Sequence, residues 1–172
     1  MRKYLFAAIA ILFIGQVQGQ DEEVTTLILV RHAEKAFDKE GDPVLTEEGE
    51  RRAEALAGVL HEVGVDAVYS TPFKRTRLTV APVVESKRLE VLEYNPFKLE
   101  DMIQTIEENR GKTLLISGHS NTTPAILNML LGEDKYMQLD ESDYDNLYIV
   151  YYLGVGKAKV LQLQYGELSS VE

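Results

Sequence analysis

The chain contains no cysteine among its 172 residues. Disulfide bonds, thiolate nucleophiles and cysteine-ligated metals are therefore excluded. Histidine is scarce as well, since only His32, His61 and His119 are present. Three histidines leave little room for a classical zinc site, so we expect chemistry that uses neither a metal nor another cofactor.

Positive charge is also in short supply. The chain has 18 Lys and Arg residues against 28 Asp and Glu residues, which gives a net charge of −10. An acidic surface repels nucleic acid and anionic lipid, so both are poor partners. An anionic substrate would have to be attracted by a local cluster of cationic side chains.

The N-terminus has the pattern of a secretory signal peptide. The basic residues of MRK precede the apolar run YLFAAIAILFI, which is too short to span a membrane. Val17 and Gly19 suit the −3 and −1 positions of a cleavage site, so we expect a signal peptide over residues 1–19. The predicted location is periplasmic or secreted, without stable membrane insertion after cleavage; an uncleaved anchor is the alternative. No cysteine follows the apolar run, which excludes a bacterial-type lipoprotein.

Residues 20–172 contain neither repeats nor a long linker and are expected to form a single domain. Apolar, β-branched runs predict strands, and apolar residues at a helical period predict helices between them. The strands are expected at residues 24–30, 66–69, 89–94, 113–117, 147–153 and 158–164. The helices are expected after Thr46, in the segment around Pro82, and at residues 99–108 and 121–131. The second of these helices is expected to bend or end near Pro82. This alternation predicts an α/β fold, a three-layer α/β/α sandwich with a mainly parallel sheet and an antiparallel C-terminal hairpin at its edge.

Polar residues follow three of the predicted strands directly. LILV runs into Arg31 and His32, LLISG runs into His119 and Ser120, and AVYS leads to Arg75. Ligands of open α/β sheets bind beyond the carboxyl ends of the strands. If these strands are near neighbours, two histidines and two arginines converge on one pocket.

Such a cluster suits phosphoryl transfer. Arginine forks bind phosphate oxygens bidentately, and a neutral imidazole is a competent nucleophile near pH 7. The alternatives to a catalytic site are that the histidines have only structural roles and that Ser120 and Asn121 cap the N-terminus of the next helix. The acidic run at residues 140–145 is expected to be a solvated loop, with a calcium site as the alternative.

Four segments resemble the histidine phosphatase superfamily, which includes the phosphoglycerate mutases, as a compact branch 1 type of member. Arg31-His32-Ala33-Glu34 is a variant of the family's R-H-G motif, and Gly118-His119 matches its late G-H motif. Residues 45–53 match the pattern L-T-x-x-G-x-x-[QR]-A, and residues 71–79 resemble S-P-x-x-R-A-x-x-T. The segments occur in the expected order, which makes the resemblance specific.

The resemblance implies a role for each matching residue. His32 is similar to the nucleophile that becomes phosphorylated, and Arg31 and Arg75 to the phosphate clamp. His119 is similar to the second histidine, which stabilises the transferring group. Ser120 follows that histidine and is expected to help bind substrate.

The chain also departs from its relatives in ways that bear on the proton donor. Mutase-type members often have asparagine where this chain has Asp38, and acid-phosphatase relatives have aspartate where it has Ser120. The large insertion of the mutases is absent. Glu93 best matches the glutamate that serves as general acid in small members, and Asp38 and Glu34 are weaker candidates.

These features support three hypotheses. The first is an exported phosphomonoesterase that acts through a covalent phosphohistidine on a small phosphorylated substrate. The second is a phosphohistidine-protein phosphatase, which the small size favours and the predicted leader disfavours. The third is a catalytically silent domain that binds a phosphorylated ligand. The sequence leaves the substrate and the oligomeric state open.

Overall fold

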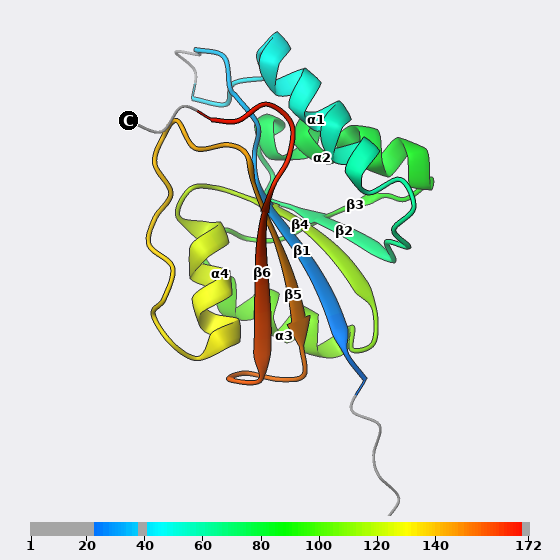
Figure 1. Cartoon of the computed structure of the whole chain (residues 1–172), viewed down its shortest axis with the longest axis vertical. Helices are drawn as coiled ribbons and strands as arrows, with labels where there is room; N and C mark the ends of the chain where they lie inside the picture. Colours follow the sequence, from blue (N-terminus) through cyan, green and yellow to red (C-terminus); the bar gives the residue numbers. More distant parts are fainter. Residues whose placement is uncertain (1–22, 38–40, 170–172) are drawn as a thin grey trace, which may run out of the picture.

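The computed structural model describes residues 23–37 and 41–169 (Figure 1). The predicted signal peptide and Asp38 lie outside these ranges. Within them, one sheet contains six strands in the order β3-β2-β4-β1-β5-β6. The strands are β1 (Thr25–Arg31), β2 (Ala67–Ser70), β3 (Val91–Glu93), β4 (Thr113–Gly118), β5 (Asn146–Tyr152) and β6 (Ala158–Gln164).

The direction of the strands agrees with the expected fold. The neighbours β3, β2, β4 and β1 pair in parallel, and β5 and β6 form an antiparallel hairpin at one edge. Parallel strands bring their carboxyl ends to the same edge of a sheet. The residues that follow β1, β2, β3 and β4 therefore share that edge.

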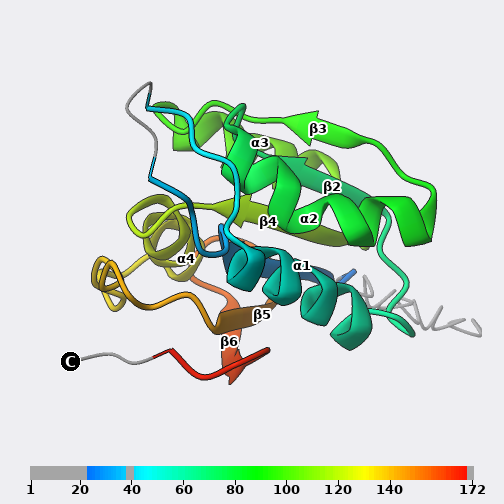
Figure 2. The ribbon, with the colours of Figure 1, turned by 90° about the horizontal axis from the view of Figure 1, so that it is seen from above.

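Four helices cover the two faces of the sheet, as Figure 2 shows. They are α1 (Glu47–Val59), α2 (Lys74–Lys87), α3 (Leu99–Glu108) and α4 (Thr122–Leu131). The helices α1 and α2 pack on one face around Leu56, Val80 and Val83. The other face carries α3 and α4, so the predicted three layers are confirmed.

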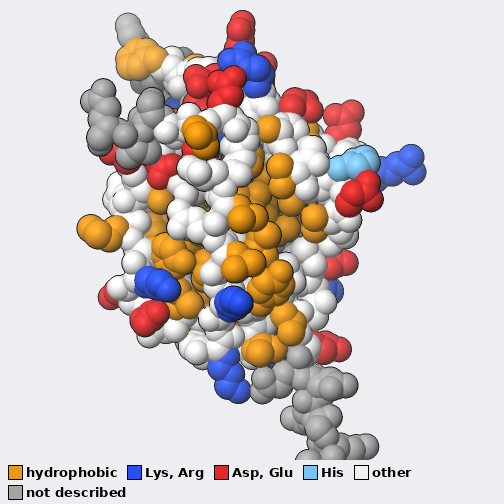
Figure 3. All heavy atoms as spheres, in the orientation of Figure 1, with side chains coloured by type: hydrophobic (Ala, Val, Ile, Leu, Met, Phe, Trp, Pro, Cys, Tyr) orange, Lys and Arg blue, Asp and Glu red, His pale blue; other side chains and the backbone are white. Residues whose placement is uncertain are grey.

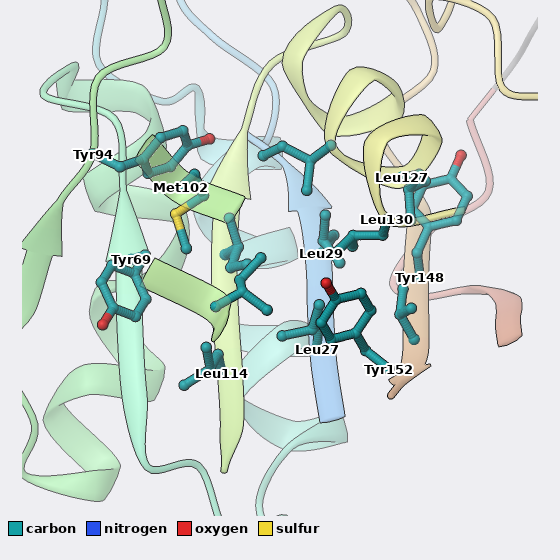
Figure 4. Packing of buried hydrophobic residues seen from close by; sticks show 14 residues of the cluster. Leu27, Leu29, Tyr69, Tyr94, Met102, Leu114, Leu127, Leu130, Tyr148 and Tyr152 are labelled. Atoms are coloured by element: carbon teal, nitrogen blue, oxygen red, sulfur yellow. The ribbon is translucent and has the colours of Figure 1, made fainter. Parts of the chain in front are cut away.

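The larger part of the core lies between the sheet and the pair α3–α4 (Figure 4). Leu27 and Leu29 of β1 alternate with Ile28 and Val30, so successive side chains of this strand enter opposite clusters. A strand that is buried on both faces reads as a continuous apolar run. This burial explains why β1 can hold a charged residue such as Arg31 only at its end.

Helix α1 begins as its sequence predicts. Thr46 is the N-cap, and its hydroxyl accepts a hydrogen bond from the Gly49 amide at 3.1 Å. A Cβ atom on Gly49 would lie 2.2 Å from the carbonyl oxygen of Glu34. Glycine is therefore required there because the helix packs directly against the loop that follows β1.

Helix α2 does not end near Pro82, where the sequence predicts that it bends or ends. The helix includes Pro82 in its interior and runs on to Lys87. Proline at this position removes one backbone hydrogen bond. Val80 and Val83 are fully buried against the sheet, and this packing supports the helix on both sides of the proline.

The hairpin at the edge leaves apolar side chains in contact with solvent. Figure 3 shows such side chains gathered on the face viewed there, and Tyr151, Leu161 and Leu163 are among the exposed ones. Among residues 23–37 and 41–169, no helix is long and apolar enough to cross a membrane.

Candidate active site

The two histidines of the sequence motifs meet because β1 and β4 are neighbours in register. Arg31 pairs with Gly118, so His32 and His119 leave the sheet side by side. The His32 amide donates to the Gly118 carbonyl at 2.9 Å, and the imidazole ring centroids are 5.5 Å apart. This separation allows a single phosphoryl group to contact both rings.

His32 is held in one orientation and is buried, with 3% of its surface exposed. Its Nδ1 lies 2.8 Å from the Ala33 carbonyl, which can only accept, so Nδ1 carries the proton and Nε2 has a free lone pair. Burial lowers the pKa of His32 to about 3, and the nearby Arg31 adds to the effect. The ring is therefore neutral at pH 7, which is the state that a nucleophile requires.

His119 is fixed through both of its ring nitrogens. Nη2 of Arg75 donates to Nδ1 at 3.5 Å, so the proton resides on Nε2, which donates to the Thr71 hydroxyl at 3.0 Å. Thr71 is itself held by Thr76, whose hydroxyl lies 2.8 Å away. Burial lowers the pKa of His119 to about 4, with Arg75 as the next cause.

Gly118, which precedes His119, has no room for a side chain. A Cβ atom there would lie 2.7 Å from the Thr122 hydroxyl and 2.9 Å from the Tyr94 hydroxyl. The Thr122 hydroxyl in turn accepts from the His119 amide at 2.8 Å. The glycine of the G-H motif thus lets the start of α4 pack closely enough to position His119.

Arg31 is buried and anchors the acidic segment at residues 140–145. Its Nη1 donates to the backbone carbonyls of Asp140 (2.5 Å) and Asp143 (2.9 Å), and its guanidinium lies 4.3 Å from the Tyr144 ring centroid. The acidic segment is an irregular loop whose residues 140–142 are exposed, as expected, although Asp145 is buried. It is held in place by the cation at the end of β1.

Arg75 reaches the same pocket from the first turn of α2. Its guanidinium lies 4.5 Å from the Phe73 ring centroid, and Asp42 lies 3.8 Å from Nη1. Burial lowers the pKa of Arg75, although the side chain stays charged because guanidinium groups do not deprotonate in proteins. Among the described residues, Nε of Arg75 and Nε of Arg31 are buried without a hydrogen-bond partner. Two guanidinium donors of this cluster are thus unsatisfied.

These side chains line an open pocket of about 270 Å³. A third cation, Lys35, stands at its edge. The N-terminus of the ten-residue helix α4 contributes Ser120, Asn121 and Thr122, and helix N-termini favour anions. Within the described part of the chain, no group of three or more His, Cys, Asp and Glu residues could hold a metal ion.

Ser120 lies in the pocket, but neither it nor Asn121 caps α4 as a side chain. Asn121 occupies the N-cap position without a side-chain hydrogen bond. The Ser120 hydroxyl donates to Glu141 at 3.3 Å. Glu141 also lines the pocket, and sequence reasoning missed it because it lies in an irregular acidic segment without a recognisable motif.

Glu93, the first candidate for the general acid, lies at the end of β3 but does not line the pocket of the two histidines. Its carboxylate pairs with Arg77, and it borders an adjoining hollow. The weaker candidate Glu34 is occupied elsewhere, because its carboxylate accepts from Nε (2.9 Å) and Nη2 (2.7 Å) of Arg52. Glu34 is therefore paired with Arg52 and not with Arg31.

The fold and the pocket define an α/β protein whose carboxyl-edge site combines two neutral imidazoles with arginine side chains. Residues 27–98 match the family model of the histidine phosphatase superfamily (branch 1). The resemblance that the sequence motifs indicate is thus confirmed. The match includes Arg31, His32 and Arg75 but ends before His119.

Individual proteins are similar to the chain as well. A curated relative, phosphoserine phosphatase 1 of Hydrogenobacter thermophilus, is 38% identical over 96 residues. The alignment covers 52% of this chain and 43% of the relative, so the chain spans less than half of that protein's length.

Solved structures share the fold. One is the protein histidine phosphatase SixA in complex with tungstate, with a TM-score of 0.64, 20% identity, and coverage of 81% of this chain and 96% of SixA. Another is a mycobacterial glucosyl-3-phosphoglycerate phosphatase, with a TM-score of 0.64, 12% identity, and coverage of 83% and 98%. At these identities the likeness concerns the fold alone.

Proposed function

We propose that the protein is a phosphatase that hydrolyses small phosphomonoesters through a covalent phosphohistidine on His32. The observation that carries the proposal is the pairing of two neutral imidazoles, 5.5 Å apart, with Arg31 and Arg75, whose buried Nε atoms lack partners among the described residues. Buried polar groups normally have a hydrogen-bond partner. The oxygens of a bound phosphoryl group would supply it.

The first step forms a bond between Nε2 of His32 and phosphorus and breaks the bond from phosphorus to the ester oxygen. Arg31 and Arg75 hold the other phosphoryl oxygens, and the Nδ1 atom of His119 keeps Arg75 in place by accepting from its Nη2. A carboxylic acid protonates the leaving alcohol. Water then attacks phosphorus and the N–P bond breaks. The water proton passes to the carboxylate, inorganic phosphate leaves, and His32 is neutral again.

Glu93 stays the predicted proton donor, and in this role its carboxylate leaves Arg77 for the ester oxygen. A donor is needed most when the leaving alcohol is a poor leaving group. Glu93→Gln should therefore slow the hydrolysis of an alkyl phosphate about a hundredfold and that of p-nitrophenyl phosphate much less. Equal effects on both esters would remove Glu93 from this role.

Hydrolysis of p-nitrophenyl phosphate tests the reaction itself. His32→Ala should abolish turnover, and His61→Ala, which alters an exposed histidine outside the pocket, should retain it. Labelled substrate should leave an acid-labile, base-stable label on His32 in the wild type. Turnover that survives His32→Ala, or is lost to EDTA, would overturn the mechanism. A panel of small phosphate esters and phosphohistidine proteins would then separate the two phosphatase hypotheses.

We also propose that the protein acts outside the cytoplasm, on the basis of the signal-peptide pattern in residues 1–19. Fractionation of expressing cells, followed by N-terminal sequencing, tests this. A start near Gln20 in the exported fraction would support export, and an intact Met1 in the cytoplasm would contradict it.

A further inference from the structure

A second hollow of about 370 Å³ adjoins the pocket of the two histidines. The two share Phe73, Pro96 and Phe97, so these apolar side chains form a common wall. Phe97 has 87% of its surface exposed. A single exposed apolar side chain needs no explanation, but an apolar wall beside a polar pocket is typical of a ligand site.

We propose that this hollow, which we call the apolar hollow, binds the leaving group of the substrate. The substrate would then be a phosphomonoester whose alcohol carries a flat apolar group, such as an aromatic ring. This inference rests on the proposed function, because the phosphoryl group fixes the end of the substrate that lies between the histidines.

The position of Phe73 determines on which side of the phosphoryl site the leaving group lies. Its ring meets His119 edge-on, with 5.3 Å between centroids, while the guanidinium of Arg75 lies on its face. The ring is thus fixed from two sides by members of the phosphoryl site. An ester oxygen that leaves this site along Phe73 enters the apolar hollow.

The remaining walls of the pocket disfavour an apolar group. Lys35, Glu141 and Ser120 line them, and the start of α4 closes the pocket there. Burying an apolar ring against charged side chains would desolvate them without compensation. The apolar hollow has one charged lining side chain, Glu93, and that carboxylate is paired with Arg77. A ring that covers Phe97 and Pro96 removes apolar surface from water on both partners.

Non-hydrolysable phosphonates test the apolar hollow without relying on turnover. Calorimetry on the full-length protein would compare benzylphosphonate with methylphosphonate, which share the anionic head and differ by the ring. We expect benzylphosphonate to bind about tenfold more tightly. In Phe97→Ala that preference should shrink severalfold, and because Phe97 also lines the pocket of the two histidines, the readout is the ratio of the two affinities.

Met137→Ala is the matched control, because Met137 is also 87% exposed and lines neither the pocket nor the apolar hollow. It should retain the full preference. Equal affinities for both phosphonates, or an equal loss of the preference in both alanine variants, would contradict the proposal that the apolar hollow binds the leaving group. The phosphatase proposal would stay intact. Binding of neither phosphonate would overturn the phosphoryl site and with it the proposed function.

Binding without turnover would support the apolar hollow and contradict the catalytic proposal. If wild type binds benzylphosphonate preferentially but fails to hydrolyse benzyl phosphate, the apolar hollow stands and the catalytic proposal fails. If benzyl phosphate is hydrolysed, its kcat/KM should exceed that of ethyl phosphate by about the same tenfold factor, since both are alkyl esters.

Discussion

The carboxylate of Glu141 lies 3.3 Å from Nη2 of Arg31, the side chain that is expected to bind phosphate. Its other oxygen accepts from the Ser120 hydroxyl at 3.3 Å, and Lys35 lies 3.8 Å away. A carboxylate thus occupies groups that a phosphoryl group would use. Because the Glu141 side chain is 68% exposed, it can turn into solvent without losing a buried contact.

Glu141→Gln should therefore tighten the binding of inorganic phosphate, by about threefold to tenfold. The exchange removes a negative charge that repels the anion and weakens the contact with Arg31, and partly exposed ion pairs are worth little in themselves. Inhibition constants for phosphate measure the effect, with Glu133→Gln as a control of equal charge change outside the pocket. Unchanged or weaker binding in Glu141→Gln alone would contradict this competition.

Gly49→Ala should destabilise the protein by more than about 2 kcal/mol, because its Cβ would lie 2.2 Å from the backbone oxygen of Glu34. Gly58 lies in the same helix, and a Cβ atom there would have no neighbour within 4 Å. Gly58→Ala should therefore be neutral or stabilising by up to about 1 kcal/mol. Urea unfolding of both variants measures the difference. Equal free energies of unfolding for the two variants would show that the loop after β1 can move away from an alanine at position 49 at little cost.

The sequence predicts the framework of the site because its signals are local. Apolar runs that end in Arg31-His32 and Gly118-His119 mark the buried parallel strands β1 and β4. Parallel strands bring their carboxyl ends to the same edge of a sheet, which predicts that the two motifs meet. The register that pairs Arg31 with Gly118 comes from the structure. The predicted strands and helices agree with the observed ones to within a few residues, and helix α3 has its predicted bounds.

The parts that the sequence does not reveal depend on contacts between distant segments. Glu141 reaches Arg31 across 110 positions of the chain, and Thr71 reaches His119 across 48. Neither contact has a periodic or spaced pattern. Glu93 matches a motif, but its carboxylate pairs with Arg77 of α2 and does not line the pocket. The motif does not indicate that Arg77 binds this carboxylate.

The two buried histidines should make stability depend on pH. Their pKa values of about 3 (His32) and about 4 (His119) lie below the ordinary 6.5, so the unfolded chain takes up protons first as the pH falls. Stability is thus complete above pH 6.5 and is lost below it, by about 1.4 kcal/mol per pH unit for each histidine. Urea unfolding between pH 5 and 7 should show this slope, and His32→Asn should reduce it by about half. If His32→Asn leaves the slope unchanged, the pH dependence of stability comes from other groups.

Thr71 orients His119, because its hydroxyl accepts the Nε2 proton of that ring. Thr71→Val keeps the shape but leaves that buried N–H without an acceptor, which favours the other tautomer and directs a proton toward Arg75. We expect kcat to fall about tenfold or more, and Thr71→Ser, which restores the hydroxyl, to recover most of it. Nitrogen chemical shifts of His119 report the tautomer directly. A shift in Thr71→Val that Thr71→Ser reverses would identify Thr71 as a positioning residue, whereas equal loss in both variants with an unchanged tautomer would reduce its role to packing.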